Sequence, residues 1–74
     1  MDSGNTYTKG LYTAKAHARR TDDGLYRGYV ILTRDEGSGP DTTLYEVEAT
    51  SPSEPEAFLE AKALAHRILG EIEI

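Results

Sequence analysis

The chain has 74 residues, no cysteine and a formal net charge of −5. This length allows one small domain, which buries roughly 60% of the surface that its unfolded chain exposes. The absence of cysteine excludes disulfides and thiolate metal sites, and no apolar run approaches the roughly 20 residues that span a bilayer. Because residues 1–10 lack the apolar segment of a secretory signal, we expect a cytoplasmic protein without a membrane partner.

The charge is unevenly distributed along the sequence. Residues 1–34 carry six basic and three acidic residues, a net of +3, whereas residues 35–74 carry two basic and ten acidic residues, a net of −8. Such a split can produce a molecule with one basic surface, or two halves that neutralise each other in the fold. The second arrangement is the commoner one.

The N-terminal part is predicted to form a disordered tail followed by a strand. Residues 1–10 are polar and show no periodicity, which is typical of a tail. Residues 11–20 alternate, with Tyr12 and three alanines on one side and polar residues on the other. A period of two indicates a half-buried strand, although a helix is the alternative because alanine is a poor strand former.

Two further strands follow. Residues 25–34 contain the longest apolar run of the chain, YVIL, which is typical of a central strand buried on both faces. Residues 35–41 have the composition of a loop. Residues 42–50 alternate again and are expected to run antiparallel to residues 25–34. The predicted sheet is therefore a three-stranded antiparallel meander.

The turn Asp22-Asp23-Gly24 determines the register of the first hairpin. A three-residue loop closed by Gly24 pairs Thr21 with Leu25 and puts small residues opposite the central strand: Ala18 opposite Gly28, Ala16 opposite Val30 and Ala14 opposite Leu32. A two-residue loop would instead place polar residues opposite that strand: Lys15 opposite Leu32 and His17 opposite Val30. A shift of one residue exchanges the two faces, so we prefer the three-residue loop.

A helix is predicted over residues 54–69. Both Ser51 and Ser53 fit a capping box, and Ser53 is preferred because it places Pro55 in the first turn, where no backbone N–H is required. Gly70 is expected to end the helix, leaving residues 71–74 as a tail. The apolar stripe has helical spacing and consists of Ala57, Phe58, Ala61, Leu64, Ala65, Ile68 and Leu69.

The elements together predict an α+β domain over residues 11–70, with three strands and one C-terminal helix packed on one face of the sheet (β-β-β-α). Small residues around Gly28 should let the helix approach closely, with Phe58 filling the space above that glycine. The most buried positions are expected to be Val30, Leu32, Tyr45, Val47, Phe58, Ala61, Leu64, Ala65 and Ile68.

Two stretches carry a resemblance: Tyr26-Arg27-Gly28-Tyr29 on the central strand and the Ser-capped, alanine-rich helix of residues 53–69. The outline resembles a group of short uncharacterised bacterial proteins and, weakly, the C-terminal part of double-stranded-RNA-binding domains. In place of the lysine pair that holds phosphate at the helix N-terminus in those domains, this chain has Glu54 and Glu56. The resemblance therefore implies a fold, and no activity.

No grouping of catalytic, cofactor-binding or metal-binding residues is found, so we expect no enzyme and no cofactor. His17 and His66 have no second ligand at helical spacing, which argues against zinc. The serines fall in tail, loop or cap positions, so a nucleophilic triad has no clear members. Gly37-Ser38-Gly39 leads into a strand and lacks the lysine of a phosphate-binding loop.

The sheet face opposite the helix is the candidate interaction surface. Its expected members are Lys15, His17, Arg19, Leu25, Arg27, Tyr29, Ile31, Leu44, Glu46 and Glu48. An aliphatic centre with tyrosine and arginine around it is typical of a protein interface, either with another protein or with a second copy. The alternative is nucleic acid held by Lys15, Arg19, Arg27 and Tyr29. A third possibility is a solvated face on which Arg19, Arg27 and Glu48 form a ladder.

The strand edges offer a second route of interaction. Each outer strand has an unpaired edge that could accept a strand from a partner or from residues 71–74.

Overall fold

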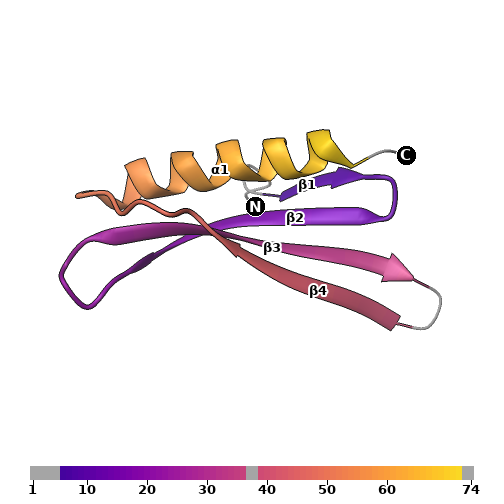
Figure 1. The fold of residues 1–74 in the computed structure, drawn as a ribbon, viewed down its shortest axis with the longest axis horizontal. Coiled ribbons are helices and arrows are strands. Elements are labelled where there is room, and N and C mark those ends of the chain that lie inside the picture. Colours follow the sequence, from indigo (N-terminus) through magenta and orange to yellow (C-terminus); the bar gives the residue numbers. More distant parts are fainter. Residues whose placement is uncertain (1–5, 37–38, 73–74) are drawn as a thin grey trace.

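The computed structural model describes residues 6–36 and 39–72, and within them the chain forms an open antiparallel sheet and a C-terminal helix. The strands are β1 (Thr6–Lys9), β2 (Tyr12–Arg20), β3 (Tyr26–Glu36) and β4 (Gly39–Glu46), and the helix is α1 (Glu54–Glu71). The strands lie in the order β1-β2-β3-β4, so that consecutive strands are neighbours. Figure 1 shows α1 on one side of the sheet. The α+β class and the internal position of the apolar strand are therefore confirmed.

The prediction of three strands was wrong by one strand. Residues 6–9, expected in the tail, form β1 and pair with β2, with Tyr7 opposite Ala14 and Lys9 opposite Tyr12. The connection is a two-residue loop in which Gly10 has a φ of 60°. A tight hairpin turn of this kind requires a positive φ at its first central position, which glycine supplies without strain. The rest of the expected tail, residues 1–5, lies outside the described residues.

The register of the β2–β3 hairpin is confirmed. Ala18, Ala16 and Ala14 lie opposite Gly28, Val30 and Leu32, as the three-residue loop requires. The N–H of Thr21 donates to the carbonyl of Leu25 at 2.7 Å, and Gly24 has a φ of 84°. Within this loop the Thr21 hydroxyl donates a hydrogen bond to the Asp23 carboxylate, which, with a further bond from the Leu25 N–H, lowers the pKa of Asp23 below its ordinary value.

The β3–β4 hairpin is longer than predicted. β3 continues to Glu36 and β4 begins at Gly39, so most of the expected loop over residues 35–41 is paired strand. At its other end β4 stops at Glu46, four residues before the predicted end of that strand. The chain then returns to β3, where Ser51 and Tyr26 exchange two backbone hydrogen bonds of 2.8 Å.

The predicted start of the helix is confirmed, and its predicted end was wrong. Ser53 is the N-cap, and its Oγ accepts a hydrogen bond from the N–H of Glu56 at 3.3 Å. The helix continues through Gly70 to Glu71. Its C-terminus is held by Lys9, whose Nζ donates to the carbonyls of Leu69 at 2.9 Å and Ile72 at 3.0 Å. An ammonium group at this position satisfies terminal carbonyls and complements the negative end of the helix dipole.

The core is built from small side chains. Ala57, Ala61 and Ala65 of α1 are fully buried, as are Ala14, Ala16 and Val30 of the sheet, with Leu32 and Leu69 nearly so. A Cβ added at Gly28 would lie 2.3 Å from the carbonyl oxygen of Ala57 and 3.0 Å from the Cβ of Ala61. The helix backbone therefore rests directly on the central strand at Gly28.

Several predicted core positions were wrong. The space above Gly28 is occupied by the helix backbone at Ala57 rather than by Phe58, which is only half-buried beneath the ammonium of Lys62. Leu64, Ile68 and Val47 are half-buried, and Tyr45 is 37% exposed. The reason is the position of α1, which packs mainly on β2 and β3 and also touches β1. Figure 1 shows β4 as the strand farthest from the helix.

The close contact at Gly28 predicts a large effect of a single methyl group. Gly28→Ala forces the helix away from β3 and should lower the free energy of unfolding by about 1–3 kcal/mol, the cost of overpacking a core. Urea unfolding followed by circular dichroism measures this change.

Gly70→Ala is the matched control, because Gly70 lies in α1 with nothing within 4 Å of an added Cβ. Alanine is the better helix former there and should stabilise the protein by about 0.5–1 kcal/mol. Equal unfolding midpoints for Gly28→Ala and the wild type would contradict the close contact.

Candidate interaction surface

The open face is the side of the sheet opposite α1, and strand alternation determines its members. Eight of the ten predicted residues come from positions of β2, β3 and β4 that alternate with the buried ones. They fall into three rows across the strands: Lys15, Ile31 and Leu44; His17, Tyr29 and Glu46; and Arg19 with Arg27. The other two lie outside the strands, Leu25 before β3 and Glu48 after β4.

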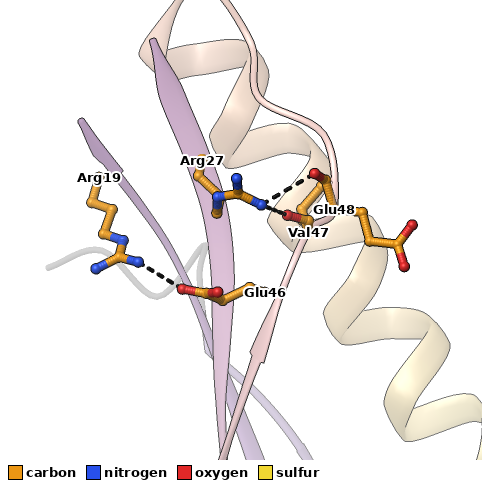
Figure 2. A network of polar contacts seen from close by, with 5 residues as sticks. All are labelled: Arg19, Arg27, Glu46, Val47 and Glu48. Atoms are coloured by element: carbon orange, nitrogen blue, oxygen red, sulfur yellow. Dashed lines mark hydrogen bonds and ion pairs between the residues drawn. The ribbon is translucent and has the colours of Figure 1, made fainter. Parts of the chain in front are cut away.

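The two arginines lie directly opposite each other and reach different partners (Figure 2). Arg19 forms an ion pair with Glu46, with 2.6 Å between Nη2 and Oε2. Arg27 donates from Nη1 to the carbonyls of Val47 at 2.7 Å and Glu48 at 3.1 Å. The predicted ladder through the Glu48 side chain is wrong in its partners, because β4 ends at Glu46 and Glu48 no longer follows the strand register.

An aromatic stack lies beside the arginines. The rings of His17 and Tyr29 are 5.1 Å apart and inclined by 21°, and the guanidinium of Arg19 lies 5.9 Å from the centre of the Tyr29 ring. Protein groups thus already contact the ring that the nucleic-acid hypothesis reserves for a base.

The aliphatic part of the open face is small. Ile31 is half-buried between Lys15 and Leu44, and Leu44 is 58% exposed at the edge of the sheet. Two other exposed leucines lie elsewhere, Leu11 in the β1–β2 turn and Leu59 on α1, where it is 60% exposed. Leu44 is therefore the most exposed aliphatic side chain on the open face among the described residues.

A row of threonines crosses the open face and was missed in the sequence. Its members come from all four described strands and are adjacent in register: Thr8, Thr13, Thr33 and Thr42. Threonine suits a pleated surface, and threonine pairs opposite each other on neighbouring strands stabilise a sheet. The signal was obscured because Thr8 was assigned to the tail, so that the row could not be recognised before β1 was known.

Two hollows border β4. The larger, of about 650 Å³, lies between the end of β4 and α1 and is lined by residues that include Tyr45, Val47, Leu64 and Arg67. It was missed because Tyr45 and Leu64 were expected to be buried. The smaller, of about 430 Å³, is lined by Arg19, Arg20, Thr21, Asp22, Arg27 and Glu46 at the end of the β2–β3 hairpin.

The described residues contain no cluster of three or more histidine, aspartate or glutamate side chains able to hold a metal ion. The two histidines are in different places. The ring of His66, on α1, lies 4.4 Å from that of Tyr7 on β1, whereas His17 stacks on Tyr29 on the open face. Across residues 6–36 and 39–72, no helix is long and apolar enough to cross a membrane.

Comparison with known proteins gave no match to a family model, to a curated protein or to a solved structure.

The different partners of the two arginines predict different energetic roles. Arg27→Met leaves two carbonyls without their donor and should lower the free energy of unfolding by about 1.5–3 kcal/mol, the range for hydrogen bonds to charged groups. Arg19→Met removes an exposed ion pair and should cost at most about 1 kcal/mol. Urea denaturation of both variants measures the difference, and a larger loss for Arg19→Met would contradict the contacts in Figure 2.

Proposed function

We propose that the chain is a small non-catalytic interaction module that binds a protein partner or a second copy through the open face. One observation carries this proposal: the arginines of the face are engaged within the chain. Arg19 is paired with Glu46, and Arg27 is bound to backbone carbonyls. What remains for a partner is a mixed surface of Ile31, Leu44 and the threonine row, with Lys15 beside Ile31.

Such a surface suits a protein better than a polyanion. The cores of protein interfaces are depleted in charged residues and enriched in tyrosine and arginine around aliphatic side chains. Tyr29 is already stacked on His17 with Arg19 beside its ring, and contacts of this kind reduce the side-chain freedom that is lost when a partner covers it. The absence of a catalytic grouping in the sequence supports a role without chemistry. The absence of cysteine fits the cytoplasm as the proposed location.

Nucleic acid is the alternative, and the arginine-lined hollow of about 430 Å³ favours it. Lys15, Arg19, Arg27 and Tyr29 would be the contacts. The same hollow also contains Asp22 and Glu46, and a phosphate would have to displace Glu46 from Arg19. Phosphate binding depends on concentrated positive charge, which the acidic chain provides poorly. We therefore rank this function second.

Substitution of Ile31 tests the proposed function. Ile31→Glu puts a carboxylate at the centre of the open face and should reduce recovery of partners from native extract at least about tenfold, since a partner that covers this position must desolvate the new carboxylate and Lys15 opposite it. Quantitative mass spectrometry of the captured proteins measures the recovery. Leu59→Glu is the control, because Leu59 is an exposed aliphatic residue on α1, away from the open face, and this variant should recover partners as the wild type does.

Full recovery by Ile31→Glu would contradict the proposal. A chemical-shift titration with short single- and double-stranded oligonucleotides at low salt separates the alternative. If Arg27 and Tyr29 signals move and the effect disappears with salt, nucleic acid is the better assignment.

A further inference from the structure

β4 is an uncovered edge strand. It is the last strand of the order β1-β2-β3-β4, and residues 41–46 are all exposed. The opposite edge, β1, is half as long, with four residues against eight, and its Lys9 is tied to the end of α1. Proteins usually protect long edge strands, because the unpaired backbone of such an edge accepts another strand. β4 is therefore the edge that is open to pairing.

The hydrogen bonds around β3 show which residues of β4 direct their backbone outward. The N–H of Val47 donates to the carbonyl of Gly28 at 2.9 Å, and Tyr26 and Ser51 exchange two bonds farther along. In an antiparallel pair the direction alternates along the strand. The backbones of Thr43 and Tyr45 therefore point to β3. Those of Thr42, Leu44 and Glu46 point to the outer edge.

From this geometry we propose that β4 pairs antiparallel with β4 of a second copy, about a two-fold axis at Leu44. Leu44 then lies opposite Leu44 of the second copy, and Thr42 lies opposite Glu46 in both directions. Each of these pairs exchanges both of its backbone hydrogen bonds. The two sheets become one continuous sheet with both helices on the same side. The interface is isologous, which closes the assembly as a dimer.

The sequence of β4 selects this register over its neighbours. An axis at Thr42 would place Leu44 opposite Pro40, which has no N–H to donate. An axis at Glu46 would place two carboxylates directly opposite each other, which is destabilising. An axis at Thr43 would place Glu46 opposite Pro40, and an axis at Tyr45 would place Thr42 opposite Glu48, beyond the end of β4. The axis at Leu44 is the register that pairs all three outward residues within β4 without a proline or a like-charge pair.

The side chains along the proposed seam are compatible with pairing. On the open face, Leu44 is 58% exposed and would be covered by its own copy. On the other face, Tyr45 is 37% exposed at the border of the larger hollow and would lie beside Thr43 of the second copy. Glu46 is already held by Arg19 at 2.6 Å, so its carboxylate is partly neutralised where two acidic chains meet.

This inference rests on the proposed function as an interaction module and deepens it by naming the partner, a second copy of the chain. It assigns that partner to the edge of β4 rather than to the centre of the open face. Ile31 lies on β3, one strand away from the seam, so the two assignments respond to different substitutions.

A charge exchange at Leu44 tests the proposal. The full chain is measured by sedimentation equilibrium from about 10 μM to about 1 mM, the concentration range over which a weak dimer dissociates. We expect the wild type to approach the dimer mass at the upper end. Leu44→Lys and Leu44→Glu each place like charges across the axis. Each variant measured alone should therefore have a dimer dissociation constant at least about tenfold higher than that of the wild type. Their equimolar mixture should recover the dimer, because opposite charges then face each other.

Leu59→Lys, on the outer side of α1, is the matched control and should associate as the wild type does. A wild type that stays monomeric to about 1 mM overturns the proposal, as does a mixture of the Leu44 variants that stays monomeric. Ile31→Glu separates this inference from the proposed function. If Ile31→Glu keeps the dimer but loses other partners, both stand. If Ile31→Glu abolishes the dimer while the Leu44 variants keep it, the open face is the interface and edge pairing is wrong.

Discussion

The contact between Gly28 and the backbone of α1 fixes the arrangement of the whole domain. An added Cβ at Gly28 would lie 2.3 Å from the Ala57 carbonyl oxygen, so the helix can rest on β3 only where that strand has no side chain. The alanines at positions 57, 61 and 65 follow at intervals of one helical turn, and Ala61 and Ala65 form one buried cluster with Ala14 and Ala16 of β2. This close packing replaces the large aliphatic side chains on which most small cores depend.

A core of small residues has a consequence for what the helix can cover. Long side chains would hold the helix farther from the sheet and spread its contacts over more strands, whereas alanines bring it down onto a narrow strip. α1 accordingly packs on β2 and β3, and Lys9 at its C-terminus binds it to β1. β4 lies beyond this strip, and the hollow of about 650 Å³ between β4 and α1 marks the space that a larger core would fill.

The exposed strand β4 determines which part of the open face is accessible. Because α1 does not cover β4, Tyr45 is partly exposed. Because β4 is the last strand in the sheet order, the outward backbone of Leu44 has no neighbouring strand among the described residues. The arginines at the other end of the open face are engaged by Glu46 and by the carbonyls that follow β4. The part of the open face that these contacts leave exposed lies toward its β4 edge, around Leu44.

Local sequence patterns correctly predicted the structural features that depend on residues close together in the chain. Asp22-Asp23-Gly24 determined the β2–β3 register because a three-residue loop allows only one pairing, and Ser53 identified the helix start through its capping box. The failures depend on distant contacts. Gly70 did not end α1, because Lys9, sixty residues earlier, satisfies the carbonyl of Leu69.

The sequence predicted which strand residues share the open face, but not which contacts their side chains make. Strand alternation is enough to place Lys15, Tyr29 and Ile31 on one face. It does not reveal where β4 ends, and this end decides whether Arg27 meets the side chain of Glu48 or the backbone carbonyls of Val47 and Glu48. Alternation also assigned Tyr45 to the helix side correctly, but burial depends on whether the helix reaches that strand.

Amide hydrogen exchange along β4, measured in dilute solution by NMR, tests most directly whether this strand is an open edge of the sheet. The structure predicts alternation: the N–H groups of Thr43 and Tyr45, directed at β3, exchange slowly, while those of Thr42 and Leu44 exchange at rates near those of an unprotected chain. Slow exchange at all four positions in a monomeric sample would contradict this account, because it would mean that another segment of the same chain covers the edge of β4.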